Sequence, residues 1–292
     1  MKVTDFDGYV KMLELSPPKI PSLSEVFGKV ERVAGHFDMI NFAEPLIRRE
    51  GDAYMGTVYT SLRVKERFGI DVIPYLTCRE HNWRDISANL LAALDAHIQN
   101  FLILSGDRSI GEGHSSEVRE FYPSKLIGRI KKKDNSFSEQ NVCLGTAFNT
   151  NAIDIKKEVE VLKKKFQQGA DFIQTQLIFN VDKGREAFEL ASKNGINIPI
   201  ILEVTVLKNF RYAKNLVDNF GIDIPEDYLD RIRTVEEKEQ KLGNSAPSGE
   251  VEKEGVKITK EILNQLRDNA NGLCISWVSV DSAVEVIGGI DY

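Results

Sequence analysis

Cysteine and histidine are both scarce in this sequence. Its 292 residues include only three cysteines, at positions 78, 143 and 274, and none of them is in CxxC spacing. An odd, widely spaced set argues against a disulfide framework and against a structural zinc site. Of the four histidines, His81 and His114 fall in predicted loops without a second ligand at metal-binding spacing. We therefore expect a reducing compartment and no metal centre.

Excess positive charge and long apolar segments are also missing. The chain has 38 lysines and arginines against 44 aspartates and glutamates, which gives a formal net charge of −6. The basic surface that nucleic-acid-binding proteins carry is therefore not expected. No apolar run approaches the roughly 18 residues of a membrane span, and the first residues contain no apolar signal segment. These absences predict a cytoplasmic protein that binds neither nucleic acid nor membrane.

What the chain does contain is a regular alternation of apolar segments and helical patterns. Strands are predicted at 12–15, 38–43, 71–78, 100–105, 141–148, 171–179, 198–205 and 273–279. Eight such βα units in 292 residues are typical of a (β/α)8 barrel. An open doubly wound sheet usually has a glycine-rich phosphate turn after its first strand, and Pro17-Pro18 stand there instead. We predict the α/β class and one TIM barrel over residues 1–292, with a flexible loop near 242–252.

Several helix starts can also be predicted from local signals. Ser22 and Glu25 have the spacing of a capping box, which predicts a helix from Ser22 to about residue 34. Asn82 can cap a helix at 83–97, and Gly69 is suited to end the helix before it. A further helix is predicted at 258–269.

Polar side chains interrupt the apolar strands at a few positions. Glu14 lies between leucines, Thr77 and Asp107 come near the ends of two strands, and Gln174 and Gln176 fall on one face of a third. Because the carboxyl ends of barrel strands share one mouth, we expect Glu14, Thr77, Asp107 and Gln176 to converge. A carboxyl in apolar surroundings can act as a general acid, although a Glu14 paired with a cation at the barrel bottom is an equal alternative. The buried amides suggest a polar heterocycle as ligand, or else a side-chain network.

Five short motifs follow one another along the chain. They are Leu13-Glu14-Leu15-Ser16-Pro17-Pro18, Tyr75-Leu76-Thr77-Cys78, Leu104-Ser105-Gly106-Asp107, Gly169-Ala170-Asp171 with Thr175-Gln176-Leu177-Ile178-Phe179, and Asn209-Phe210 with Ala213-Lys214. In this order they resemble the motifs of the methylenetetrahydrofolate reductase family, the flavin-dependent (β/α)8 enzymes of one-carbon metabolism. Each motif is moderately specific, and the five in register cover nearly the whole chain.

The resemblance implies a hydride-transfer reaction. FAD reduced by NADH or NADPH would convert 5,10-methylenetetrahydrofolate to the 5-methyl form, a step that serves methionine biosynthesis. The implied catalytic residues are Glu14, as the general acid that assists ring opening to an iminium, Asp107, beside the flavin and the pterin, and Gln176, as a hydrogen-bond partner of the pterin. Gln174 and Tyr212 would complete the substrate site.

The resemblance also implies a cofactor site. Its flavin contacts are Tyr75, Thr77, Ser105, Gly106, Asp107, Tyr122, Ser124, Phe148, Glu158 and Lys165. Lys165 would meet the FAD phosphates. We expect a homo-oligomer, and an electron-delivering partner subunit is an open alternative.

Some positions differ from the family pattern. Glu44 stands in the family's Thr-Tyr-Gly motif, and Ser105 and Ser282 stand where the family has arginine. These differences leave open an archaeal-type pterin, FMN or no flavin, a methyl-transfer or demethylase reaction, and an electron-accepting subunit of a complex. A non-catalytic pterin-binding scaffold is a further alternative, but a scaffold would need no acid in an apolar pocket.

Overall fold

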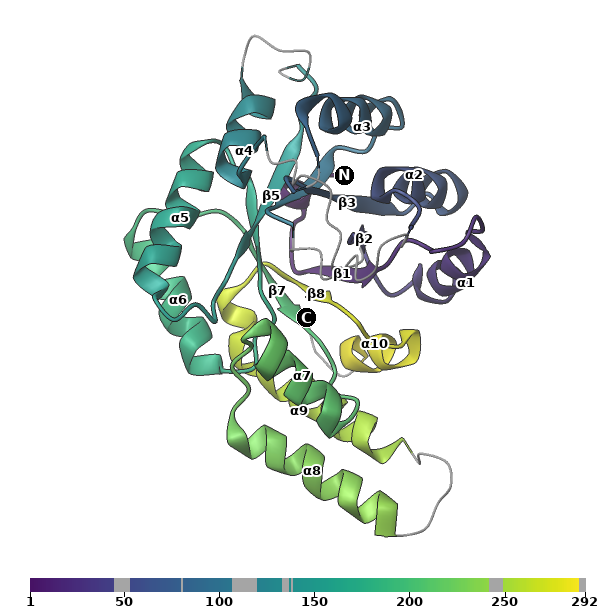
Figure 1. Ribbon diagram of the computed structural model, residues 1–292, viewed down its shortest axis with the longest axis vertical. Coiled ribbons are helices and arrows are strands. Elements are labelled where there is room, and N and C mark those ends of the chain that lie inside the picture. The colour runs from purple at the N-terminus through teal and green to yellow at the C-terminus, as the bar shows by residue number, and fades with distance from the viewer. Residues whose placement is uncertain are drawn as a thin grey trace, which may run out of the picture.

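The chain folds into a closed barrel of eight parallel strands that pair in chain order (Figure 1). The computed structural model describes residues 1–44, 53–79, 81–106, 120–132, 137, 139–241 and 249–288. The strands are β1 (Val10–Leu15), β2 (Met39–Phe42), β3 (Asp71–Thr77), β4 (Asn100–Leu104), β5 (Cys143–Phe148), β6 (Phe172–Thr175), β7 (Ile200–Val204) and β8 (Gly272–Ile275). The barrel closes where β1 pairs with β8, with Val10 opposite Gly272. The predicted (β/α)8 fold is confirmed.

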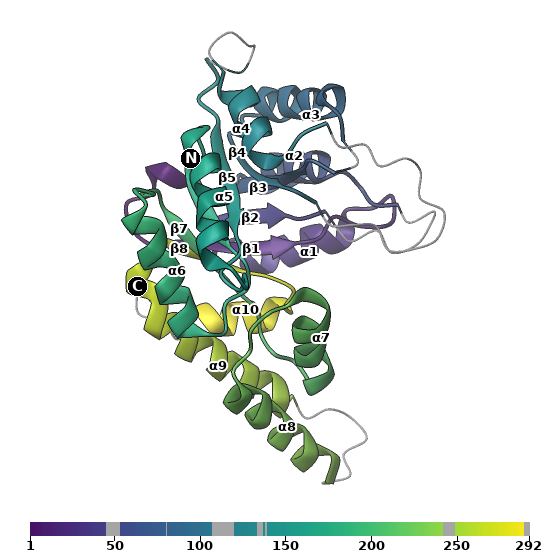
Figure 2. The same ribbon diagram turned by 60° about the vertical axis from the view of Figure 1, so that its left-hand side comes forward.

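Helices surround the barrel on its outer side (Figures 1 and 2). They are α1 (Ser24–Val33), α2 (Thr57–Phe68), α3 (Trp83–Asp95), α4 (Pro123–Lys131), α5 (Ile155–Gln167), α6 (Val181–Lys193), α7 (Phe210–Phe220), α8 (Glu226–Lys241), α9 (Glu250–Leu266) and α10 (Val280–Ile287). The helix α8 packs against α9, and this helical pair extends away from the barrel (Figure 2). Among the described residues, no helix is long and apolar enough to cross a membrane.

Local sequence signals place several of these helix ends. The Asn82 side chain accepts a hydrogen bond from the Asp85 N–H and caps α3, as predicted. Gly69 ends α2 with φ 68°, a left-handed conformation that glycine adopts without steric cost. The Ser22 prediction is wrong, because α1 begins at Ser24 and the Ser22 hydroxyl accepts from the Ser24 N–H just before the helix.

The predicted boundaries near the C-terminus also need correction. α9 begins at Glu250, eight positions before the predicted start at 258, so that the last part of the predicted loop at 242–252 is helical. The apolar positions of this first part, Val251 and Val256, are buried. The strand prediction at 171–179 is too long, since β6 ends at Thr175.

Alternating side chains divide the barrel into two apolar layers. Val10 and Met12 of β1 face the lumen, whereas Leu13 and Leu15 belong to the larger core between the sheet and the helices. The ring of Phe172 fills the lumen beside Gly145, where even a Cβ atom would collide with it. This apolar layer closes the amino-terminal end of the lumen, and polar residues begin one alternation further along the strands.

Candidate active site

A cavity of about 1070 Å³ lies at the carboxyl ends of the strands. Every described residue of the predicted site lines this cavity. These residues are Glu14, Tyr75, Thr77, Ser105, Gly106, Tyr122, Ser124, Phe148, Glu158, Lys165, Gln174, Gln176 and Tyr212. Asp107 lies outside the described residues. The predicted convergence of β1, β3 and β6 on one mouth is therefore observed.

The Tyr75 hydroxyl is the centre of a hydrogen-bond network at the floor of the cavity. It donates to Glu14 Oε2 over 2.8 Å and accepts from Gln174 Nε2 over 2.8 Å. The same Gln174 nitrogen donates to Glu203 Oε2 over 3.1 Å. Asn41 Nδ2 donates to Gln174 Oε1 over 3.2 Å and to the Tyr75 hydroxyl over 3.4 Å. Three strands, β2, β3 and β6, thus contribute polar groups that hold the Glu14 carboxyl in place, and β7 adds a second carboxyl.

Burial raises the pKa of the Glu14 carboxyl well above its ordinary value, and the nearby Glu203 carboxyl raises it further. Hydrogen bonds from Tyr75, Ser276 and Trp277 act in the opposite direction without cancelling these effects. Burial also raises the pKa of Glu203, which Gln174 and Ser276 partly oppose. Glu14 is therefore a carboxyl that can hold a proton near neutral pH, which is what a general acid requires. The alternative of a Glu14 paired with a cation is not observed among the described residues.

Glu203 and Asn41 are not among the site residues predicted from the sequence. Glu203 interrupts an apolar strand in the same way as Glu14, in the order Leu202-Glu203-Val204. Two positions before each of these carboxyls lies a lumen residue, Met12 before Glu14 and Ile201 before Glu203. The period of two along each strand was the signal that could have found them.

Trp277 follows β8 at the rim of the cavity and has an unusual backbone conformation. Its φ is 59°, in a region that bulky residues rarely occupy. The side chain is 40% exposed, lines the cavity and packs on Phe220 with the ring centroids 5.6 Å apart. Its contact with Glu14 connects the rim to the acid.

The two predicted glutamines have different surroundings. Gln174 is buried in the network around Tyr75, whereas Gln176 lies beyond the end of β6 and is partly exposed. Gln176 Oε1 accepts a hydrogen bond from the N–H of Leu177 over 3.0 Å. This bond uses the oxygen of the side-chain amide and not its NH₂ group. Tyr212 on α7 also faces the cavity, with its hydroxyl 3.2 Å from the Thr205 hydroxyl.

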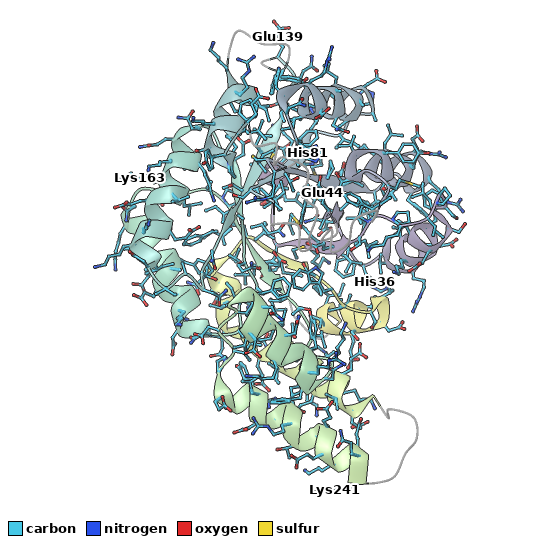
Figure 3. All side chains as sticks on the ribbon, viewed as in Figure 1. His36, Glu44, His81, Glu139, Lys163 and Lys241 are labelled. Atoms are coloured by element: carbon cyan, nitrogen blue, oxygen red, sulfur yellow. The ribbon has the colours of Figure 1, made fainter. Side chains whose placement is uncertain are left out.

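The predicted flavin contacts lie on the side of the cavity formed by β3 to β5 and the helices α4 and α5. Thr77 donates to Glu44 Oε2 over 2.6 Å, and His81 Nε2 lies 3.3 Å from Glu44 Oε1. Figure 3 shows Glu44 and His81 close together, and both residues follow the ends of their strands, β2 and β3. Lys165 of α5 is buried, and its Nζ donates to the Ala147 carbonyl over 2.7 Å. Burial lowers the pKa of this amine, and Glu158 opposes that effect.

The remaining predicted contacts form the outer wall. Tyr122 precedes α4 and is 52% exposed, and Ser124 lies in the first turn of that helix. Gly106 has φ 79°, and a Cβ there would come within 2.9 Å of the Arg79 Cβ. The positive φ and this close approach both favour glycine at position 106. Arg79 Nε also donates to the Gly106 carbonyl over 3.2 Å. In the described part of the chain, no three His, Cys, Asp or Glu residues are grouped as a metal site.

Residues 8–274 match the family described as methylenetetrahydrofolate reductase. Methylenetetrahydrofolate reductase 1 of Schizosaccharomyces pombe (strain 972 / ATCC 24843) is 26% identical over 230 residues, which cover 77% of this chain and 36% of the relative. The 5,10-methylenetetrahydrofolate reductase of Escherichia coli (strain K12) is 25% identical over 162 residues, which cover 56% of this chain and 53% of the relative. The alignments thus span about a third to about half the length of these relatives.

Solved structures give the same fold. A Clostridium thermocellum protein, described as binding two copies of 5-methyl-5,6,7,8-tetrahydrofolic acid, superimposes with a TM-score of 0.69 over 98% of this chain and 95% of that chain, at 15% identity. The family match covers nearly the whole barrel, from before β1 into β8, and includes the strand that carries Glu14. The chain belongs to the methylenetetrahydrofolate reductase family.

Proposed function

We propose that the chain reduces 5,10-methylenetetrahydrofolate, or a related methylene-pterin, to its 5-methyl form by hydride transfer. The observation that carries this proposal is Glu14, a buried carboxyl with a raised pKa at the floor of a large cavity. Relatives named methylenetetrahydrofolate reductases support the substrate class.

In this proposal Glu14 is the general acid. The five-membered ring of the substrate opens to an iminium when one of its nitrogens is protonated, and a neutral carboxyl can supply that proton. The hydrogen bond from Tyr75 fixes the orientation of the carboxyl. Burial against the apolar lumen disfavours the charged form of the carboxyl, so Glu14 keeps its proton until a substrate nitrogen takes it.

The pterin would be held by amide and hydroxyl groups around Glu14. The bond from the Leu177 N–H to Gln176 Oε1 fixes the orientation of the side-chain amide. In this proposal the NH₂ group of Gln176 donates to the pterin. Tyr212 of α7 also lines the cavity and offers a hydroxyl. An N-rich ring needs such donors and acceptors, because its polar edges must stay paired when it leaves water.

The cavity also suits a flavin. Its volume of about 1070 Å³ is at the upper end of the roughly 300–1,000 Å³ of small-molecule sites, which leaves room for two ring systems. Phe148 offers an apolar surface, Tyr122 and Ser124 offer hydroxyls, and Lys164 and Lys165 offer positive charge for phosphates. A flavin bound there would supply the hydride and would be reduced again by NADH or NADPH.

A second candidate is a folate-binding family member that works without flavin. Glu44 favours it, because this carboxyl accepts the Thr77 hydroxyl and adds negative charge on the proposed flavin side. The Clostridium thermocellum structure, described with two copies of 5-methyltetrahydrofolic acid, supports the same idea. The cavity is large enough for two such ring systems.

The absorption spectrum of the purified protein and anaerobic turnover together separate these candidates. For the reductase we expect flavin bands, and oxidation of NADH, NADPH or a reduced artificial dye that depends on methylenetetrahydrofolate. For the flavin-free candidate we expect a colourless protein that binds 5-methyltetrahydrofolate in calorimetry. A flavin-containing protein that turns over no methylene-pterin with any of the three donors would contradict the reductase proposal.

A further inference from the structure

Two carboxyl groups, not one, lie in the polar floor of the cavity. Glu14 belongs to β1 and Glu203 to β7, and β8 lies between these strands. Ser276, just after β8, hydrogen-bonds both carboxyls. On the other side, Tyr75 and Gln174 connect them through bonds of 2.8, 2.8 and 3.1 Å. The two groups are thus bridged from both sides.

Among the residues that the structure describes, the titratable groups that face this pair bring no positive charge. The titratable groups whose pKa values respond to Glu14 and Glu203 are Tyr75 on β3, Cys274 on β8 and Tyr212 on α7. Each of these is neutral when protonated, and each would add a negative charge if it lost its proton. Two carboxylates without a cation cannot both be ionised in a buried site at low cost. One proton therefore remains on the pair.

The bridging groups differ in what they offer each carboxyl. Glu203 Oε2 receives an N–H from the Gln174 amide, a nitrogen that can donate but cannot accept a proton. Such a donor favours the ionised form of Glu203. Glu14 Oε2 receives the Tyr75 hydroxyl, which also favours ionised Glu14. A hydroxyl, however, can also accept from a protonated carboxyl, so Tyr75 suits a protonated Glu14 better than Gln174 suits a protonated Glu203.

We propose that Glu203 is a positioning residue that holds the negative charge of the pair and thereby keeps Glu14 protonated for its role as acid. This inference rests on the proposed function, in which Glu14 delivers a proton to a methylene-pterin. When the C–N bond of the five-membered ring breaks, its electron pair stays on the nitrogen, and the proton of Glu14 bonds to that nitrogen. The bridging carbon becomes part of the iminium cation, and Glu14 becomes a carboxylate. The new cation then lies beside two carboxylates, which offsets their repulsion, and solvent later returns the proton to Glu14.

The test compares Glu203→Gln with the unchanged protein in two measurements. The first is the pH profile of methylene-pterin turnover. The second is an infrared titration of the buried protonated carboxyl, which Glu14→Gln assigns because it removes the Glu14 signal. Removing the charge of Glu203 makes ionisation of Glu14 easier. We therefore expect both the alkaline limb of the profile and the Glu14 titration to move down by about one pH unit or more. Glu203→Asp keeps the charge, so we expect its pH profile and its Glu14 titration to lie close to those of the unchanged protein.

The second variant, Glu14→Gln, tests which carboxyl loses its proton first. In the unchanged protein Glu203 ionises beside a neutral, protonated Glu14, and in Glu14→Gln it ionises beside a neutral amide, so we expect the Glu203 titration to stay where it is. An unchanged Glu14 titration in folded Glu203→Gln would overturn the inference. Should Glu203→Gln fail to fold, the infrared titration of Glu203 in Glu14→Gln decides, because a clear fall there would mean that Glu14 ionises first and would overturn it. The infrared result does not depend on turnover, so a wrong substrate would leave this test intact.

Discussion

At β1 a single carboxyl replaces hydrocarbon between Leu13 and Leu15, and its neighbours determine its chemistry. Tyr75 donates to it and Gln174 supports Tyr75. A glutamine at this position would keep the size and could still accept the Tyr75 bond, but it could not release a proton.

Glu14→Gln is therefore expected to separate two steps. Reduction of a bound flavin by nicotinamide should be preserved, whereas methylene-pterin reduction should fall by about 10² to 10⁴. Anaerobic stopped-flow absorbance measures each step alone. Equal loss of both steps in a folded protein, or loss of neither, would exclude Glu14 as the acid.

Lys165 provides a test of the proposed flavin side. Its buried Nζ donates to the Ala147 carbonyl, and Lys165→Met would remove this charge while it keeps much of the side-chain volume. We expect flavin affinity to fall about tenfold, in line with the loss of a hydrogen bond to a charged group. Lys163 lies on the same helix and points outward (Figure 3), so Lys163→Met is the matched control. Fluorescence titration with FAD measures both variants, and equal effects would contradict the assignment.

At the residue level, the sequence located polar groups that interrupt apolar strands, and the structure places them in the cavity. The sequence did not reveal groups whose importance depends on partners from other strands, and the functional roles stay predictions. Glu14 and Gln174 stand out because their neighbours along the chain are apolar. Glu203 has the same local pattern, but its importance depends on Gln174 and Ser276, which come from other strands. Distances between strands depend on how the barrel closes, and no local pattern contains that information. Asp107 stays a prediction.

Among the elements, α8 and α9 form a pair that an arginine holds together. Arg231 of α8 donates to both oxygens of Glu261 over 2.6 and 2.8 Å and to Glu254 over 2.8 Å. Both glutamates belong to α9. Strand and helix order were predictable here, but the extent of α9 was not, because its first turns are highly charged and resemble a loop in composition.

Arg231→Ala is expected to loosen α8 without changing the barrel. The partly exposed contact should contribute about 1 kcal/mol to the free energy of unfolding, and Arg231→Lys should not restore it because an ammonium cannot form the paired bonds. Hydrogen exchange within α8 should accelerate in both variants. Arg233→Ala on the same helix, where the ion pairs are more exposed, should have a smaller effect. No difference between the two alanine variants would contradict the role of Arg231.

For the molecule as a whole, the buried carboxyls make stability depend on pH. Glu14 and Glu203 have pKa values above their ordinary 4.5 in the folded chain. Between 4.5 and the raised pKa of each group, the folded state therefore binds more protons than the unfolded state. Their contribution is complete below 4.5 and is lost as pH rises through the folded pKa values. The slope is at most about 1.4 kcal/mol per pH unit for each extra proton.

Urea denaturation from pH 5 to pH 9 measures this dependence. We expect the free energy of unfolding to fall across the range in the unchanged protein. A variant with both Glu14→Gln and Glu203→Gln should show a flatter profile. If the double variant kept the full slope, other groups would be responsible for it.

The pairing of β1 with β8 has a consequence for how the protein is made. Val10 and Gly272 are neighbours across the closing seam, yet a ribosome must synthesise the other six strands of the barrel between β1 and β8. The first strand, with its acid, must wait with one edge open until the last strand emerges. A nascent chain therefore acquires its chemistry only after β8 has emerged, and until then that edge is a surface for chaperones to cover.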